Sequence, residues 1–153
     1  MTQTQLHHVR LVDVPVARFL EMQQQHDAML REFSLIALSA NDPTMHEVPR
    51  RILDVSEEMR ARFGVASATF RSGILRAHDR GDTLVTLELQ IPFETLRWAE
   101  DFLVMFEEGD DFCRQGELLT QPSSARVEAF RRWLVGEVIR QIRDGAAPTP
   151  FTD

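Results

Sequence analysis

The sequence predicts a mainly α-helical fold, a single-domain bundle of about five helices with a small two-stranded β element. Apolar residues recur at intervals of three and four through most of the 153 residues. Two short runs, residues 9–14 and 83–91, instead show the alternation of strands. The chain is 43% hydrophobic and 27% charged, which is typical of a globular domain with a core. We expect the domain to span residues 1–145, with a proline-containing tail over residues 146–153.

The first half begins with a short strand and continues as helices. Residues 9–14 are rich in valine and stop at Pro15, where the spacing becomes helical and continues to Leu38. A second helix is expected from Val48 until Gly64 closes it. Residues 66–78 predict a third helix, although they contain Gly73.

The second half starts with the clearest strand pattern of the chain. Residues 83–91 alternate between apolar and polar side chains and end at Pro92. Helical spacing then runs over residues 93–118, and again over residues 125–143 with Gly145 as the C-cap. Phe151 is expected to dock the tail onto the body.

A strand, a proline and a long helix therefore occur twice, with Pro15 and Pro92 lying 77 positions apart. This pattern predicts a pseudo-repeat in which the two strands pair, with helices packed over one face. The alternative is a plain helical bundle in which one or both runs stay unpaired.

Charge and composition exclude several classes of function. The net charge is −7, and residues 93–117 hold eight acids against two arginines, which argues against nucleic acid or an anionic membrane as a partner. No apolar run reaches the roughly 20 residues of a membrane span, and the N-terminus does not resemble a secretory signal. We expect a cytoplasmic protein. No lysine is present for Schiff-base or phosphate-loop chemistry, and no cofactor is predicted.

His26-Asp27 is the pair that invites a chemical interpretation. A histidine followed by an acid on a helix is found at the phosphoacceptor site of histidine kinases, so phosphotransfer through His26 is one hypothesis. The other is a packed histidine, because His26 lies within the apolar stripe and Asp27 is placed to pair with Arg31.

Metal sites are not favoured by the spacing. His46, His78-Asp79 and Asp110 or Asp111 could form the ligand set of a metal-dependent phosphohydrolase, but His78-Asp79 runs directly into a turn. The acids at 107, 108, 110 and 111 lack the regular spacing of a calcium loop and predict a solvated helix face. Cys113 lies among acids, which should raise its pKa. We predict no metal site.

The last helix carries a dense patch with the composition of interaction hot spots. The candidate partner-binding residues are Arg131, Arg132, Trp133, Glu137 and Arg140. The competing interpretation is a core tryptophan with solvated arginines that pair with the acidic helix.

Ordered blocks along nearly the whole chain resemble a domain of actinobacterial regulatory proteins. These blocks are HDAMLREFSLIA (26–37), VPRR (48–51), DRGD (79–82), LLT (118–120), FRRW (130–133), EVIRQ (137–141) and PTPF (148–151). Such domains occur alone or beside ATP-binding modules of the anti-sigma-factor kinase type. The resemblance implies no catalytic residues.

The resemblance implies a non-enzymatic regulatory or protein-interaction domain in partner-switching or two-component-type signalling. Its expected partner is a protein, either an ATP-binding regulatory kinase or a second copy in a homodimer. Two alternatives stay open, namely phosphotransfer through His26 in a dimeric bundle and a small-ligand sensor. The sensor pocket would be lined by Met22, Met29, Phe33, Met59 and Phe102.

Overall fold

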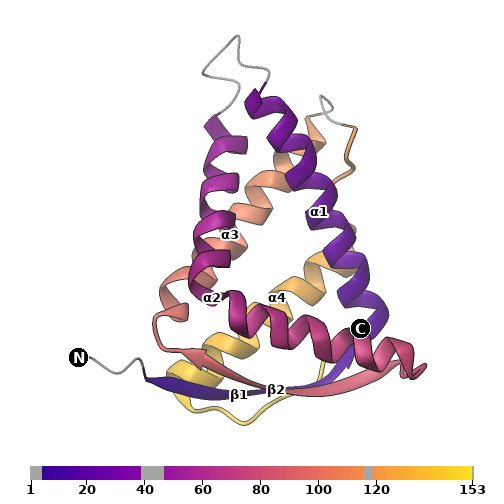
Figure 1. Cartoon of the computed structure of the whole chain (residues 1–153), viewed down its shortest axis with the longest axis vertical. Coiled ribbons are helices and arrows are strands. Elements are labelled where there is room, and N and C mark those ends of the chain that lie inside the picture. The colour runs from indigo at the N-terminus through magenta and orange to yellow at the C-terminus, as the bar shows by residue number, and fades with distance from the viewer. Residues whose placement is uncertain (1–4, 39–46, 116–118, 153) are drawn as a thin grey trace.

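The order strand, helix, helix occurs twice along the chain. The computed structural model describes residues 5–38, 47–115 and 119–152. Its elements are β1 (Leu6–Pro15), α1 (Val16–Leu38), α2 (Glu47–Asp79), β2 (Leu84–Pro92), α3 (Thr95–Arg114) and α4 (Ala125–Asp144). Figure 1 shows the sheet at the base of the molecule, with α1, α3 and the first part of α2 rising from it. The mainly α class with a small β element is therefore confirmed.

The two strands pair with each other. β1 and β2 form an antiparallel two-stranded sheet in which Arg10 lies opposite Glu88 and Leu11 opposite Leu87. β1 begins at Leu6, three residues before the predicted strand. Antiparallel pairing of the first elements of the two strand–helix–helix units agrees with the predicted pseudo-repeat.

A bulge in β1 sets which of its side chains are buried. The register shifts between Leu11 and Val14, so two residues of β1 lie opposite Thr86. One of them, Asp13, has φ 55°, and its backbone N–H donates to Thr86 Oγ1 at 3.4 Å. The extra residue returns Val14 to the buried face that Val9 and Leu11 occupy. This explains why the alternation of the sequence weakens before Pro15.

α2 is one helix of 33 residues where the sequence predicted two. Gly64 does not end it, and Figure 1 shows that α2 changes direction near its middle, where Gly64 lies. Gly73, further along, has a packing reason: a Cβ there would lie 2.4 Å from Leu87 Cδ2. The glycine therefore lets α2 lie close against the sheet.

α3 and α4 have well-defined ends. α3 runs through Gly109 without a break and ends at Arg114, four residues before the expected end. The N-cap of α4 is Ser124, whose side chain accepts a hydrogen bond from Val127 N at 3.2 Å. Gly145 is its C-cap in the left-handed region, as predicted.

The buried side chains form two clusters. The first, at the sheet, joins β1 and β2 to the first half of α1, the second half of α2, and α4. The second lies among the helices further from the sheet and contains Met29, Phe33, Ile52, Met105, Phe106 and Cys113. Among the described residues, no helix combines the length and apolar character needed to cross a membrane.

Candidate functional site

A pocket of about 480 Å³ lies where the four helices face one another and the sheet. We call it the inner pocket. Most of its wall is apolar, and its lining includes Phe19, Met22, Met59, Phe70, Phe102 and Val135. Ligand sites usually have volumes of roughly 300–1,000 Å³ and mostly apolar walls, so the inner pocket has the dimensions of a small-molecule site.

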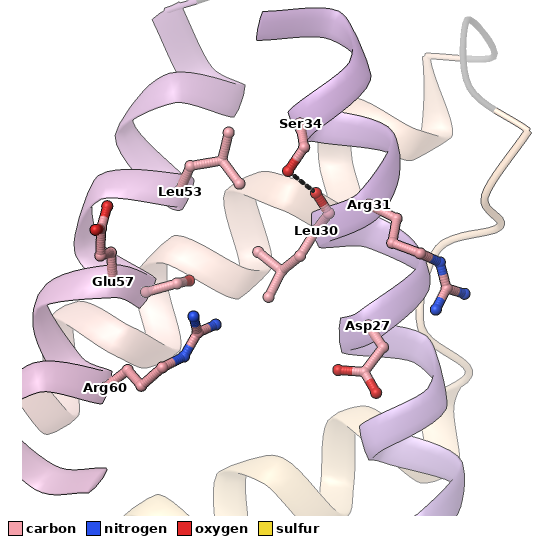
Figure 2. A pocket seen from close by; sticks show the side chains of 8 residues that line it. Asp27, Leu30, Arg31, Ser34, Leu53, Glu57 and Arg60 are labelled. Carbon is pink, nitrogen blue, oxygen red and sulfur yellow. Dashed lines mark hydrogen bonds between the residues drawn. The ribbon is translucent and has the colours of Figure 1, made fainter.

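A second depression, the outer groove, lies between α1 and α2 and measures about 490 Å³. Figure 2 shows Leu30 of α1 and Leu53 of α2 on its two sides, with the guanidinium of Arg60 reaching from α2 towards α1. The groove shares Asp27, Leu30, Ser56 and Arg60 with the inner pocket. The two depressions therefore adjoin each other.

The outer groove carries balanced and unpaired charges. Asp27 and Glu57 contribute two carboxylates, and Arg31 and Arg60 contribute two guanidiniums. None of the four makes an ion pair with another described residue, so the expected pair between Asp27 and Arg31 does not form. In Figure 2 the Arg31 side chain points away from Asp27.

Two hydroxyl groups in the wall of the inner pocket have no partner. Ser56 Oγ and Thr95 Oγ1 are buried, and neither makes a hydrogen bond with a described residue. A buried hydroxyl without a partner costs about 1–3 kcal/mol, so most buried hydroxyls in proteins are bonded. Both residues line the inner pocket, but neighbouring atoms cover their hydroxyl oxygens.

A buried polar network forms part of the pocket wall through His26. Arg131 Nε donates to His26 Nε2 at 3.1 Å, and Arg131 Nη1 bonds Asp110 Oδ2 at 3.2 Å. Arg131 Nη2 donates to Ser123 Oγ at 2.7 Å, and Ser123 donates from N and Oγ to Asp110 Oδ1. The guanidinium also lies 5.1 Å from the centre of the Phe106 ring. The network joins α1, α3, α4 and the connection before α4.

His26 is held in its neutral form. Burial lowers its pKa well below the ordinary value, and the charge of Arg131 lowers it further. The ring stacks on Phe106 with 3.8 Å between centroids, and its Nε2 accepts from Arg131, which assigns the proton to Nδ1. Because the Nε2 lone pair is already engaged, this geometry does not favour phosphotransfer through that nitrogen.

The predicted partner-binding residues of α4 do not share one surface. Arg131 and Glu137 are 1% and 2% exposed, so neither is accessible to a partner in this structure. Trp133 and Arg140 are half-buried and hold the tail. Only Arg132 of the five is exposed, and it pairs with Glu107 of α3 at 3.2 Å. Pairing of arginines with the acidic helix agrees with the competing interpretation for Arg132.

Glu137 anchors the tail to α4. Its carboxylate accepts from Thr149 N at 3.1 Å and from Thr149 Oγ1 at 2.6 Å, and it also binds Arg140 and Gln141. Burial alone would raise the pKa of Glu137, but these hydrogen bonds outweigh it and hold the pKa below its ordinary value. Phe151 then packs against Trp133 with 5.5 Å between ring centroids, so the tail docks as expected.

The residues tested as metal ligands are separated or otherwise engaged. His46 lies outside the described residues, and His78 is exposed in the last turn of α2. Asp110 belongs to the buried network, while Asp111 pairs with Arg114 at 2.5 Å. In the described part of the chain, no three His, Cys, Asp or Glu side chains are grouped to hold a metal ion.

Cys113 is buried and has an unreactive thiol. Burial raises its pKa to about 11, with added contributions from the negative charges of Asp110 and Glu32. The sequence predicted a raised pKa for Cys113 because of the neighbouring acids. The structure shows that burial is the larger cause.

Three of the five residues predicted for a ligand pocket, Met22, Met59 and Phe102, do line the inner pocket. Met29 and Phe33 lie instead in the second core cluster. Reasoning from sequence missed Ser56 and Thr95, whose positions have no distinguishing pattern. It could have found the network, because Asp110 falls on the apolar stripe of its helix as His26 does on its own.

Comparisons with protein-family models, curated proteins and solved structures found no match to this chain.

Proposed function

We propose that this chain is a cytoplasmic regulatory domain that binds a small, largely apolar molecule in the inner pocket. The observation that carries the proposal is a pocket of about 480 Å³ with mostly apolar walls. The charged outer groove adjoins this pocket.

The regulatory part of the proposal rests on the resemblance to actinobacterial regulatory domains and on a coupling argument. His26 is in the pocket wall and also in the buried network that joins α1, α3 and α4. A molecule in the pocket would therefore contact the group that holds these helices together. Ligand binding can shift a conformational equilibrium only through such differential contacts.

A protein partner remains part of the proposal, either an ATP-binding regulatory kinase or a second copy of the chain. Because Arg131 and Glu137 are buried, the partner would contact other residues, of which Arg132 is the exposed candidate on α4. Partner-switching or two-component-type signalling is the context that the resemblance supports.

Binding can be tested with the uncharged fluorescent probe N-phenyl-1-naphthylamine, which becomes bright in apolar sites. We expect saturable binding to the wild-type chain. Ala99→Leu should weaken it at least tenfold, because Ala99 is 6% exposed and lines the pocket, where a larger side chain takes ligand volume. Arg97→Leu, which adds the same side chain at an exposed position of α3, should bind the probe as wild type does.

Circular dichroism should show both variants folded, since Ala99→Leu extends into existing space. Absence of saturable binding to the wild type, or equal binding by wild type and Ala99→Leu, would contradict the proposed function.

A further inference from the structure

The inner pocket has an apolar interior and an open mouth on α2. Phe19, Phe70 and Phe106 line the interior and are buried. Ser67 and Ala68 also line the pocket, but they are exposed, so the pocket opens to the surface beside them. A molecule that fills the interior with an apolar chain would have its other end at this mouth.

The charged side chains of the pocket lining do not balance. Among the described residues of the lining, the charged ones are Asp27, Arg60 and Arg71, all of them exposed. Asp27 and Arg60 also line the outer groove and have opposite charges, whereas Arg71 lines the inner pocket alone. The lining therefore has one positive charge in excess, and Arg71 supplies it.

Gln23 of α1 holds the guanidinium of Arg71 at the edge of the pocket. Its side-chain oxygen accepts from Arg71 Nε at 2.9 Å and from Nη2 at 2.8 Å, in the amide orientation that satisfies both groups. A neutral amide does not compensate the charge of Arg71. Because the guanidinium is already positioned, binding an anion would restrict the Arg71 side chain little further.

The free side of this guanidinium fits a carboxylate. Gln23 occupies the side formed by Nε and Nη2, and the N–H groups on the side formed by Nη1 and Nη2 have no partner among the described residues. Two adjacent N–H groups of this kind bind a carboxylate through parallel hydrogen bonds. The carboxylate would lie at the mouth, where water still reaches it, so its desolvation costs less than that of a fully buried ion.

We infer that the ligand of the inner pocket is an apolar monocarboxylate, whose carboxylate binds Arg71 at the mouth and whose apolar chain fills the interior. This inference rests on the proposed function, and it adds the charge of the ligand and the residue that recognises it. A single negative charge matches the single excess positive charge of the lining.

The test compares four probes with the same alkyl chain on the full chain: decanoate, 1-decanol, decyl phosphate and decyltrimethylammonium, each below its critical micelle concentration. Displacement of N-phenyl-1-naphthylamine at pH 7.5 reports their affinities. We expect decanoate to bind about tenfold more tightly than decyltrimethylammonium, which Arg71 repels, and about threefold more tightly than uncharged decanol. Decyl phosphate should bind less tightly than decanoate, because nothing in the lining matches its second negative charge.

Three variants test the role of Arg71. Arg71→Gln should weaken decanoate binding about five- to tenfold and change decanol binding less than about twofold. Arg71→Glu should reverse the preference, so that decyltrimethylammonium binds more tightly than decanoate. Arg76→Gln, the matched control, removes the same charge from an exposed position of α2 outside the pocket lining and should bind every probe as wild type does. Circular dichroism should show all three variants folded, because both arginines are exposed.

The inference would be overturned if decanol or decyltrimethylammonium bound as tightly as decanoate, or if Arg71→Gln left decanoate binding unchanged. Tighter binding of decyl phosphate than of decanoate would overturn the assignment to a monocarboxylate. In each of these cases the fluorescent probe still binds, and the proposed function stands. If the fluorescent probe does not bind the wild-type chain, the proposed function fails and the inference fails with it.

Discussion

Arg131 carries a full charge at a position that is 1% exposed, and three segments of the chain supply its partners. A buried guanidinium is tolerated only when its donors and charge are matched. Here the carboxylate of Asp110, which is 0% exposed, matches the charge and accepts from Nη1, and Ser123 Oγ accepts from Nη2. His26 accepts the remaining Nε–H because its own pKa is lowered. The network therefore fixes how α1, α3 and α4 are placed relative to one another.

Arg131→Met should lower the free energy of unfolding by about 3–5 kcal/mol, because it leaves the Asp110 carboxylate buried without a counter-charge. The neighbouring Arg132→Met removes an exposed pair and should change stability by about 0.5 kcal/mol or less. Urea unfolding followed by circular dichroism measures both.

The double variant Asp110→Leu/Arg131→Met leaves no unpaired charge and should be more stable than Arg131→Met alone. Equal losses in the Arg131 and Arg132 single variants would show that Arg131 is not buried in solution.

For single residues, the sequence correctly placed His26 in the apolar stripe of its helix. It was wrong for Arg131, which was expected at the surface and is buried. Helical periodicity places Arg131 at the edge of the buried face, where a long side chain normally reaches solvent. Its burial depends on Asp110 and Ser123, which become neighbours only when α3 and α4 pack. The local sequence does not indicate that Arg131 lies close to Asp110 and Ser123.

Among the elements, α2 and α3 show what a glycine inside a helix does. Glycine is about 1 kcal/mol less favourable than alanine in a helix interior, which is why the sequence predicted a helix end at Gly64. Tertiary contacts reverse that preference: a Cβ at Gly109 would lie 2.6 Å from Met29 Sδ, so the glycine lets α3 pack closely on α1. Glycines that permit close packing cannot be told apart from helix ends by local rules.

Two glycines in helix interiors should respond oppositely to alanine. Gly136→Ala on α4 meets open space and should raise the free energy of unfolding by about 0.5–1 kcal/mol through helix propensity. Gly109→Ala gains the same propensity but overpacks Met29 and Ile52, so we expect a net loss of about 1 kcal/mol. Thermal unfolding of the two variants beside wild type measures this, and a similar gain in both would refute the close contact.

The strands were easier to predict than the helix boundaries, because alternation directly reports a half-buried sheet. The exception is the end of β1, where Asp13 forms the bulge. Asp tolerates φ 55° better than most residues, but an isolated Asp in a valine-rich run gives no sign of an inserted position.

For the whole molecule, three lowered pKa values act on stability in the same direction. Burial and Arg131 lower the pKa of His26. Burial alone would raise the pKa values of Glu32 and Glu137, but the hydrogen bonds that their carboxylates accept outweigh burial and lower both pKa values. In each case the unfolded chain binds protons at a higher pH than the folded one, so stability falls as pH falls. The loss begins near the unfolded value of 6.5 for His26 and near 4.5 for the glutamates.

His26→Gln should therefore flatten the pH dependence of unfolding between about pH 5 and 6.5, because glutamine can accept from Arg131 but does not titrate. Urea unfolding at half-unit pH steps measures the slope. His8→Gln, at an exposed histidine of the sheet, is the control and should keep the wild-type slope. A wild-type chain that becomes more stable on acidification through this range would contradict the neutral state of His26.

The length of α1 and of the bent α2 has a consequence for how the molecule unfolds. Each helix supplies side chains to both core clusters, α1 through Phe19 and Met29 and α2 through Ile74 and Ile52. Unfolding the whole of either helix removes side chains from both clusters, so the two clusters depend on the same two helices. The two clusters therefore form one cooperative unit, which is expected to unfold in a single transition.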